Sequence, residues 1–168
     1  IPKIRIGYLN ITDHLIMETT RYRLDQGQFA LDHAVLDARM MASFHQIIDA
    51  LVENRIDGGF IPLPAALDLF GKGLPIRLLM FAHRSGSVMV QSKVVRKLSD
   101  FSGKSILLPH FLSMQTMLSH KLFSAAGLRL GMPDDRDADV TVEIVNPYLM
   151  PDMLACDTDG DIGGYFVA

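Results

Sequence analysis

Polar side chains suited to binding a small molecule are concentrated in the segment "NITDH", residues 10–14. It follows the apolar run "KIRIGYL" and precedes a helical pattern, which predicts a turn between a strand and a helix. Thr12 or Asp13 is expected to cap that helix. The rest of the turn, Asn10 and His14 included, offers candidate ligand contacts. Asp13 would repel an anion and suits an amine or a hydroxyl group better.

Two further junctions have the same character. In "ASFHQ" (42–46), Ser43 is expected to cap a helix and to offer its hydroxyl, while Phe44 either walls a pocket or packs in the core. In "FIPLP" (60–64), backbone amides near Pro62 and Leu63 are expected to face the same space. The free N–H groups of helix starts favour an anion or a carbonyl oxygen.

The second half of the chain carries a matching set. In "PHFLSMQ" (109–115), His110, Ser113 and Gln115 converge where a strand ends and a helix starts. In "HRSGS" (83–87), Gly86 is expected to serve backbone geometry. Arg84 is the cation nearest the predicted site, either a partner for an anionic ligand or a solvated surface residue.

Other chemistries find little support in the sequence. The histidines form no His-x-x-x-His pair, "DTDGD" lacks the rest of an EF-hand loop, and no nucleophile-elbow, Walker or Rossmann glycine motif is present. Cys156 is the single cysteine, which excludes an internal disulfide. We therefore expect no catalytic residue, no metal and no cofactor.

Composition narrows the partners. The net charge is -3 with no Lys/Arg run, which disfavours nucleic acid, and the apolar runs are too short for a bilayer, which needs about 20 residues. Strand patterns alternate with helical ones. Strands are predicted at 3–9, 29–37, 56–61, 75–82, within 83–92, at 105–110, 140–147 and 161–168, and helices at 12–27, 43–55, 62–73, within 94–104, at 112–128 and 148–157.

This alternation predicts an α/β fold with largely parallel sheets. The order strand, helix, strand, helix, strand occurs in 3–61 and again in 105–165, which predicts two α/β lobes, 1–83 and 84–168, with a ligand cleft between them. In open α/β sheets, ligands bind outside the carboxyl ends of the strands, where the polar turns lie. Because the last predicted strand stops at Ala168, we expect further chain in the natural protein.

Several stretches together resemble one family. The most specific are "ALVENRIDG" (50–58), "LSDFSGKSI" (98–106) and "DIGGYFVA" (161–168), with "IRIGYLNITDHL", "HRSGSVMVQS" and "VNPYLMPDMLACDTDGD" in the matching order. The chain resembles the nitrate/sulfonate/bicarbonate branch of ABC-transporter solute-binding proteins, which includes taurine-type and thiamine-pyrimidine-precursor binders. Residues 129–139 and 155–161 look longer than the family pattern and are expected to be surface variation.

The resemblance implies a type 2 periplasmic-binding-protein fold whose lobe one is completed by a return segment that this chain lacks. It also implies ligand contacts by Ser113 and Gln115, less firmly by His110, with Tyr148 a further candidate. The implied function is capture of a sulfonate, a nitrate- or bicarbonate-like anion or a pyrimidine precursor outside the cytoplasm, for a membrane permease and without catalysis. Two alternatives stay open: an enzyme of pyrimidine or menaquinone precursor synthesis on the same fold, and a sensory ligand-binding domain.

Overall fold

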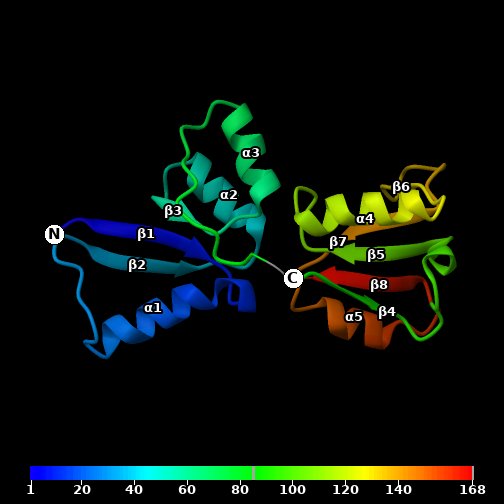
Figure 1. Cartoon of the computed structure of the whole chain (residues 1–168), viewed down its shortest axis with the longest axis horizontal. Helices are drawn as coiled ribbons and strands as arrows, with labels where there is room; N and C mark the ends of the chain where they lie inside the picture. Colours follow the sequence, from blue (N-terminus) through cyan, green and yellow to red (C-terminus); the bar gives the residue numbers. More distant parts are fainter. Residues whose placement is uncertain (85, 168) are drawn as a thin grey trace. The chain divides into compact units, whose positions relative to one another are not determined.

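The computed structural model describes residues 1–84 and 86–167. The chain divides into two compact units, Ile1–Arg84 (unit 1) and Ser85–Ala168 (unit 2). Each unit is an α/β structure with a sheet between helices (Figure 1). The α/β class expected from the sequence is therefore confirmed.

Unit 1 is built on a parallel sheet in which β1 (Lys3–Tyr8) lies between β2 (Val35–Met40) and β3 (Gly58–Gly59). A 3-10 turn η1 (Thr12–His14) and helix α1 (Leu15–Asp25) lie on one face of the sheet. Helices α2 (Phe44–Val52) and α3 (Leu63–Gly71) lie on the other face (Figure 1). All three strands run in the same direction, so their carboxyl ends share one edge.

Unit 2 repeats this plan and extends it. Strand β5 (Lys104–Leu108) lies between β7 (Val140–Ile144) and β8 (Ile162–Val167), and all three are parallel. Helix α4 (Met114–Ala125) covers one face and α5 (Met150–Cys156) the other (Figure 1). The order β4-β8-β5-β7-β6 adds a short parallel strand, β6 (Leu130–Gly131), and an antiparallel strand, β4 (Val88–Gln91); the 3-10 turn η2 (Leu98–Phe101) precedes β5.

Three sequence predictions need correction. The helix expected over 12–27 starts as the η1 turn, in which the His14 N–H bonds to the Ile11 carbonyl at 3.0 Å, and no side chain caps η1 or α1. The strand expected over 29–37 lies later, at Val35–Met40, because it is Val35 that pairs with Lys3. Two predicted strand segments extend beyond the described residues: Ser85 lies within 83–92, and Ala168 ends 161–168.

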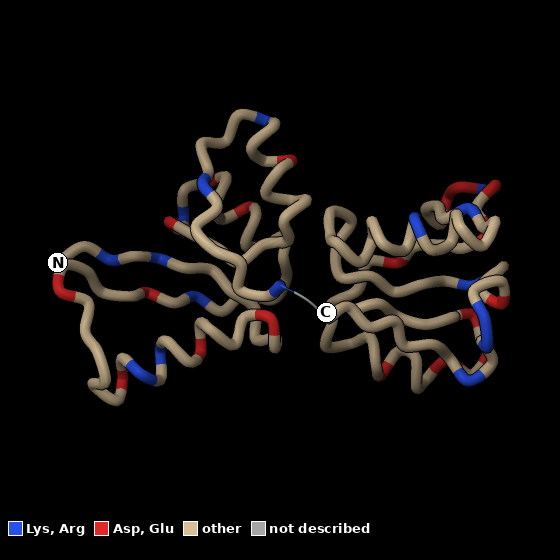
Figure 2. The backbone as a smooth tube through the Cα atoms, in the orientation of Figure 1, with Lys and Arg blue, Asp and Glu red and all other residues tan. Residues whose placement is uncertain are grey.

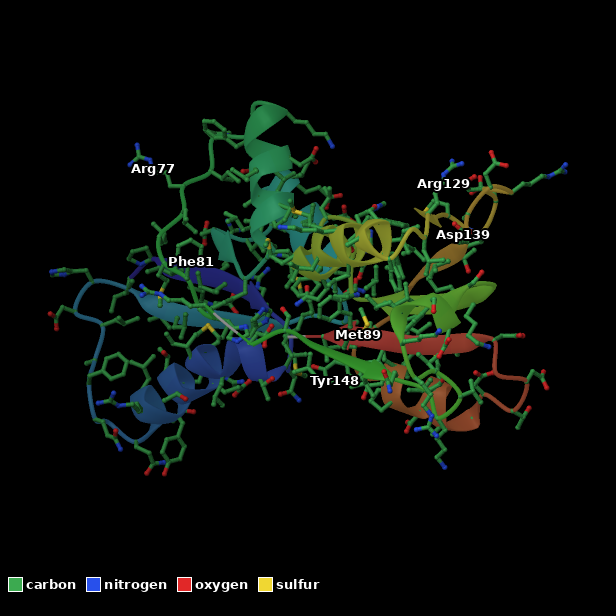
Figure 3. The ribbon with its side chains drawn as sticks, turned by 45° about the vertical axis from the view of Figure 1, so that its right-hand side comes forward. Arg77, Phe81, Met89, Arg129, Asp139 and Tyr148 are labelled. Atoms are coloured by element: carbon green, nitrogen blue, oxygen red, sulfur yellow. The ribbon has the colours of Figure 1, made fainter. Side chains whose placement is uncertain are left out.

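The third correction concerns the apolar segment 75–82, which forms no strand. It carries exposed large side chains, and Leu79 is 88% exposed. Figure 3 labels Arg77 and Phe81 on this extended stretch. Its composition suits a buried strand, but within the described part of unit 1 it pairs with no neighbouring strand, and pairing is what makes a strand.

Each unit has its own apolar core. In unit 1, Leu9, Phe44 and Ile47 pack together with Ala50 and Ile56. In unit 2 the core surrounds Phe101 and Phe123, whose ring centroids are 5.0 Å apart. Edge-on aromatic pairs of this kind add to the free energy gained by burying their area.

Two adjacent glycines of β8 allow close approach from both sides. A Cβ on Gly163 would lie 2.4 Å from Cδ1 of Phe101, and one on Gly164 would lie 2.2 Å from the Val90 carbonyl oxygen. The first absent side chain leaves room for the aromatic core, and the second lets β4 pair closely with β8.

We expect Phe123→Ala to lower the free energy of unfolding by about 3–5 kcal/mol, because it leaves a cavity beside Phe101 that the core cannot refill. Urea denaturation followed by circular dichroism measures the loss. Lys121→Ala, at an exposed position on the same helix, serves as the control and should change stability by less than about 0.5 kcal/mol. Equal effects of the two substitutions would contradict the assigned core.

Candidate functional site

The carboxyl edge of the unit 1 sheet brings together three predicted junctions. The chain leaves β1 through Leu9 and Asn10, leaves β2 through Met41, and leaves β3 through Phe60. Backbone hydrogen bonds from Met41 N to the Tyr8 carbonyl (2.9 Å) and from Phe60 N to the Gly7 carbonyl (3.0 Å) hold these exits side by side. Asn10 is exposed there, beyond the end of the sheet.

His14 supports this edge from within. It is 5% exposed, its Nδ1 accepts a hydrogen bond from Leu9 N at 2.8 Å, and its ring packs against Phe44 and Phe60, with centroids 5.9 and 4.9 Å away. Because Nδ1 accepts, the neutral ring carries its proton on Nε2. Burial lowers the pKa of His14 to about 4. His14 thus holds the turn after β1 against two aromatic rings, and its predicted ligand contact remains a prediction.

Asp13 occupies a different position from the one expected. It caps no helix; its Oδ1 lies 3.6 Å from Nδ1 of His83, a residue that the sequence reasoning had not selected. Burial raises the pKa of Asp13, and the nearby His83 opposes that rise. A partly desolvated carboxylate is therefore present at the carboxyl edge of unit 1. Nothing in the sequence pattern pairs residues 13 and 83, because the contact depends on how the segment after α3 returns.

The starts of α2 and α3 complete this edge. Ser43 caps α2, as predicted, by accepting from Gln46 N at 3.3 Å. Phe44 was expected either to wall a pocket or to pack in the core. It is 8% exposed and packs in the core. Pro62 is the N-cap residue of α3 and Leu63 its first residue, with no side-chain cap.

The carboxyl edge of unit 2 has an analogous internal support. His110 follows β5, is 4% exposed, and its Nδ1 accepts from Leu112 N at 2.9 Å. Ser113 caps α4 by accepting from Thr116 N at 3.1 Å, and the Thr116 hydroxyl donates to the His110 carbonyl at 2.7 Å. These contacts fix the turn after β5. Thr116 belongs to this hydrogen-bond network, although the sequence did not point to it.

Gln115 links this turn to the segment just before β4, the edge strand that pairs with β8. Its Nε2 lies 3.4 Å from the hydroxyl oxygen of Ser87, just before β4. Gly86 has φ of 98°, the left-handed region that glycine tolerates best, so its expected role in backbone geometry is confirmed. Tyr148, labelled in Figure 3, is 45% exposed beyond β7, and Arg84 is exposed at the end of unit 1.

Both carboxyl edges are poor in charge. Among residues 6–17, 40–48 and 58–67 of unit 1, Asp13 is the one Asp, Glu, Lys or Arg. In unit 2, residues 105–120, 144–151 and 86–92 contain none. Figure 2 shows most charged residues of unit 2 at the amino ends of its parallel strands. These edges therefore offer hydrogen-bonding and apolar groups with little net charge.

No metal centre emerges from the part of the chain that the structure describes. Within residues 1–84 and 86–167, no three His, Cys, Asp or Glu side chains gather closely enough to hold a metal ion. The helices described there are all too short or too polar to traverse a lipid bilayer.

Open parallel α/β sheets in general bind ligands outside the carboxyl ends of their strands. Solved structures of ABC-type and periplasmic ligand-binding proteins match this chain over 98–100% of its length. A ligand-binding component of an ABC-type import system from Staphylococcus aureus, solved with zinc bound, is 25% identical with a TM-score of 0.78, and the match covers 100% of this chain. The chain has the fold of ABC-type solute-binding proteins, as its sequence resemblance implied.

Two further solved structures support this assignment of the fold. The periplasmic nitrate-binding protein NrtA from Synechocystis PCC 6803 is 15% identical over 100% of this chain, with a TM-score of 0.73. The alkanesulfonate-binding protein SsuA from Xanthomonas axonopodis pv. citri, bound to MOPS, is 18% identical over 98%, with a TM-score of 0.62. All three are described as ligand-binding proteins.

The chain spans about half the length of these proteins, 55%, 47% and 54% respectively. No protein-family model matches the chain, and the comparison with curated proteins finds no match.

We expect the stability of the protein to fall between pH 7 and pH 5 by roughly 2 kcal/mol through His14 alone. The unfolded chain takes up this proton near pH 6.5 and the folded chain only near pH 4, so acid favours unfolding. The contribution is fully present above the unfolded pKa and is lost as the pH falls toward the folded one.

Urea denaturation at several pH values measures this dependence. His14→Asn, whose side-chain oxygen can still accept from Leu9, should flatten the pH dependence even where it lowers stability at pH 7. His33→Asn, at an exposed position, should leave it unchanged. An unaltered slope in the first variant would show that His14 does not titrate as a buried group.

Proposed function

We propose that the chain is part of the solute-binding component of an ABC importer and captures a small molecule at the carboxyl edges of its sheets. The observation that carries this proposal is the match of the entire chain to a ligand-binding component of an import system at a TM-score of 0.78. The buried supports His14 and His110 add to it, because each holds a turn in place beside candidate ligand contacts. The cleft predicted between the two lobes, and the lobe boundaries at 83 and 84, stay predictions.

The charges of the two edges favour a polar organic ligand over an inorganic oxyanion. Asp13 is a partly desolvated carboxylate and would repel nitrate or a sulfonate. Arg84 is the cation available to oppose that repulsion at the end of unit 1. A nitrogen heterocycle with donor groups, such as a pyrimidine precursor, fits the Asp13 carboxylate better.

Zinc, which is present in one neighbour, is not proposed as the ligand. The described residues hold no group of three metal-binding side chains, and the pair Asp13–His83 provides at most two ligands where zinc sites in proteins use three or four.

The partner and the compartment follow from the same proposal. A solute-binding component delivers its ligand to a membrane permease outside the cytoplasm, and two of the neighbours are described accordingly, one as periplasmic and one as a ligand-binding component of an import system. Both the permease partner and the extracytoplasmic location are therefore part of this proposal.

Native mass spectrometry of the purified chain, compared with the denatured chain, tests the proposal directly. A small mass released on denaturation would support a binding protein and identify the ligand by its mass. The chain would then be screened by thermal shift against sulfonates, oxyanions and pyrimidines. Failure to retain a mass, together with no stabilisation by any of these compounds, would contradict the proposed function.

Substituting Asp13→Asn distinguishes the ligand classes. If the ligand presents a cationic or donor nitrogen to Asp13, we expect affinity to fall by roughly tenfold to a hundredfold, since a hydrogen bond to a charged group contributes about 1.5–3 kcal/mol. An anionic ligand would instead bind more tightly to the variant. Isothermal titration calorimetry measures both, and Asp134→Asn, an exposed acid in unit 2, is the matched control.

A further inference from the structure

Strand β2 forms one border of the unit 1 sheet, and half of its backbone groups have no strand partner among residues 1–84 and 86–167. Val35 N bonds to the Pro2 carbonyl and Met41 N to the Tyr8 carbonyl, both at 2.9 Å. In a parallel pair, alternate residues direct both N–H and C=O to the same neighbour. Leu36, Ala38 and Met40 therefore direct their backbone groups away from β1, in the plane of the sheet, toward the open side of β2.

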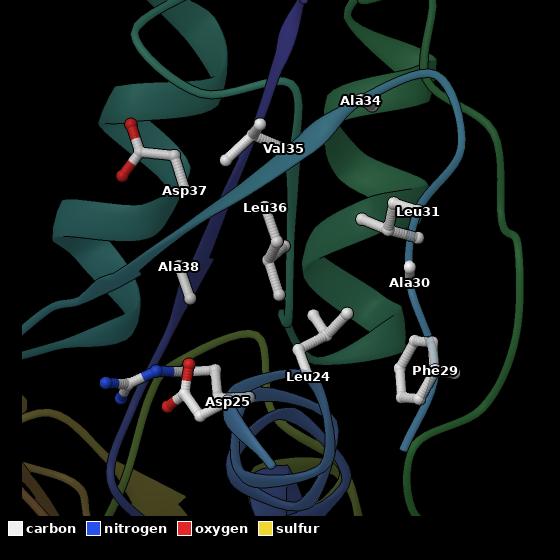
Figure 4. A pocket seen from close by; sticks show the side chains of 11 residues that line it. Leu24, Asp25, Phe29, Ala30, Leu31, Ala34, Val35, Leu36, Asp37 and Ala38 are labelled. Carbon is white, nitrogen blue, oxygen red and sulfur yellow. The ribbon is translucent and has the colours of Figure 1, made fainter. Parts of the chain in front are cut away.

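A hollow of about 510 Å³ lies against this open side. Its walls are the end of α1, the loop around Phe29 and Leu31, and β2 itself (Figure 4). Leu24 and Leu36 point toward one another across it. The volume is within the range of about 300–1,000 Å³ of small-molecule pockets, and so leaves room for a side chain of a second molecule. At the far end of the strand, Met40 is a large apolar side chain that is 64% exposed.

The sequence of β2, "VLDARM", is complementary to itself when two copies run antiparallel about Ala38. In that register Ala38 faces Ala38 of the second copy, and Leu36 faces Met40. These are the residues whose backbone groups point outward, so each opposed pair can exchange two hydrogen bonds. Between them, Asp37 of each copy faces Arg39 of the other, which places opposite charges directly across from each other.

The apolar side chains match in the same register. Alternate residues of a strand point to the same face of the sheet. Leu36 faces Leu24 of α1 (Figure 4), so Met40 also lies on the face that carries α1. Met40 of the second copy would then lie beside Leu36, at the hollow that Leu24 borders. The exposed Met40 side chain and the hollow bordered by Leu24 and Leu36, which is also lined by charged residues, are both present on each copy and are thus brought together twice.

We propose that the open edge of β2 binds a second copy of this chain, joining the two unit 1 sheets into one continuous antiparallel pairing about Ala38. A two-fold interface of this kind uses the same patch on both partners. Within one chain Arg39 already pairs with Asp37, at 2.8 Å, and donates to the Arg55 carbonyl. In the proposed dimer the two existing ion pairs lie side by side and form one cluster of four alternating charges. Exposed edges are commonly protected by charges of one sign, whereas this edge carries both signs in a self-matching order.

Sedimentation velocity over a concentration series tests the proposal on the 168-residue chain. We expect a reversible monomer–dimer equilibrium. Asp37→Arg should weaken dimerisation roughly tenfold, because two attractive pairs become repulsive. The double substitution Asp37→Arg with Arg39→Asp should restore dimerisation, since it exchanges the charges in both copies. A monomer at all concentrations, or a dimer that ignores these charges, would overturn the proposal.

Cross-linking locates the interface independently. Opposed residues of a hydrogen-bonded antiparallel pair have Cα atoms about 5.5 Å apart, which a disulfide can span. In a Cys156→Ser background, Ala38→Cys should form a covalent dimer under mild oxidation, and exposed Lys72→Cys should not. Equal cross-linking of the two variants would place the contact elsewhere. A small ligand retained by the chain does not bear on this interface, because it adds a small mass to the monomer and to the dimer alike.

Discussion

The parallel pairing of one central strand with two neighbours controls the geometry of both units. Because β1 runs parallel to β2 and β3, and β5 to β7 and β8, each chain segment that leaves a strand does so at the same edge. Each returning connection must then cross a face of the sheet as a helix. The polar turns collect at one edge for this topological reason, before any individual side chain contributes.

A buried imidazole then supports the first turn in each unit. His14 and His110 differ in position relative to their strands, yet both use Nδ1 to accept a backbone N–H. The imidazole satisfies a backbone donor that would otherwise be buried without a partner, and it does so without adding charge. Each of these two turns is thus held by a buried side chain that carries no charge.

The sequence was informative where local pattern and tertiary structure agree. The strand–helix alternation, the Ser43 cap and the repeated plan of the two units follow from period and capping chemistry. It failed where the outcome depends on distant partners. Residues 75–82 have the apolar composition of a strand but pair with no strand in the described part of unit 1. Asp13, expected to cap a helix, lies instead beside His83, which is 70 positions further along the chain and is linked to it by no sequence pattern. Contact roles of the predicted site residues depend on a ligand that sequence spacing does not specify.

The glycine pair of β8 restricts how this protein can change over evolutionary time. Any side chain at position 163 collides with Phe101, and any at 164 collides with the backbone of β4, which cannot shrink. A change at the first position therefore becomes accessible only after a smaller residue replaces Phe101, whereas the second has no compensating neighbour. Lineages that retain this sheet are thus expected to explore sequence around position 164 without ever changing it.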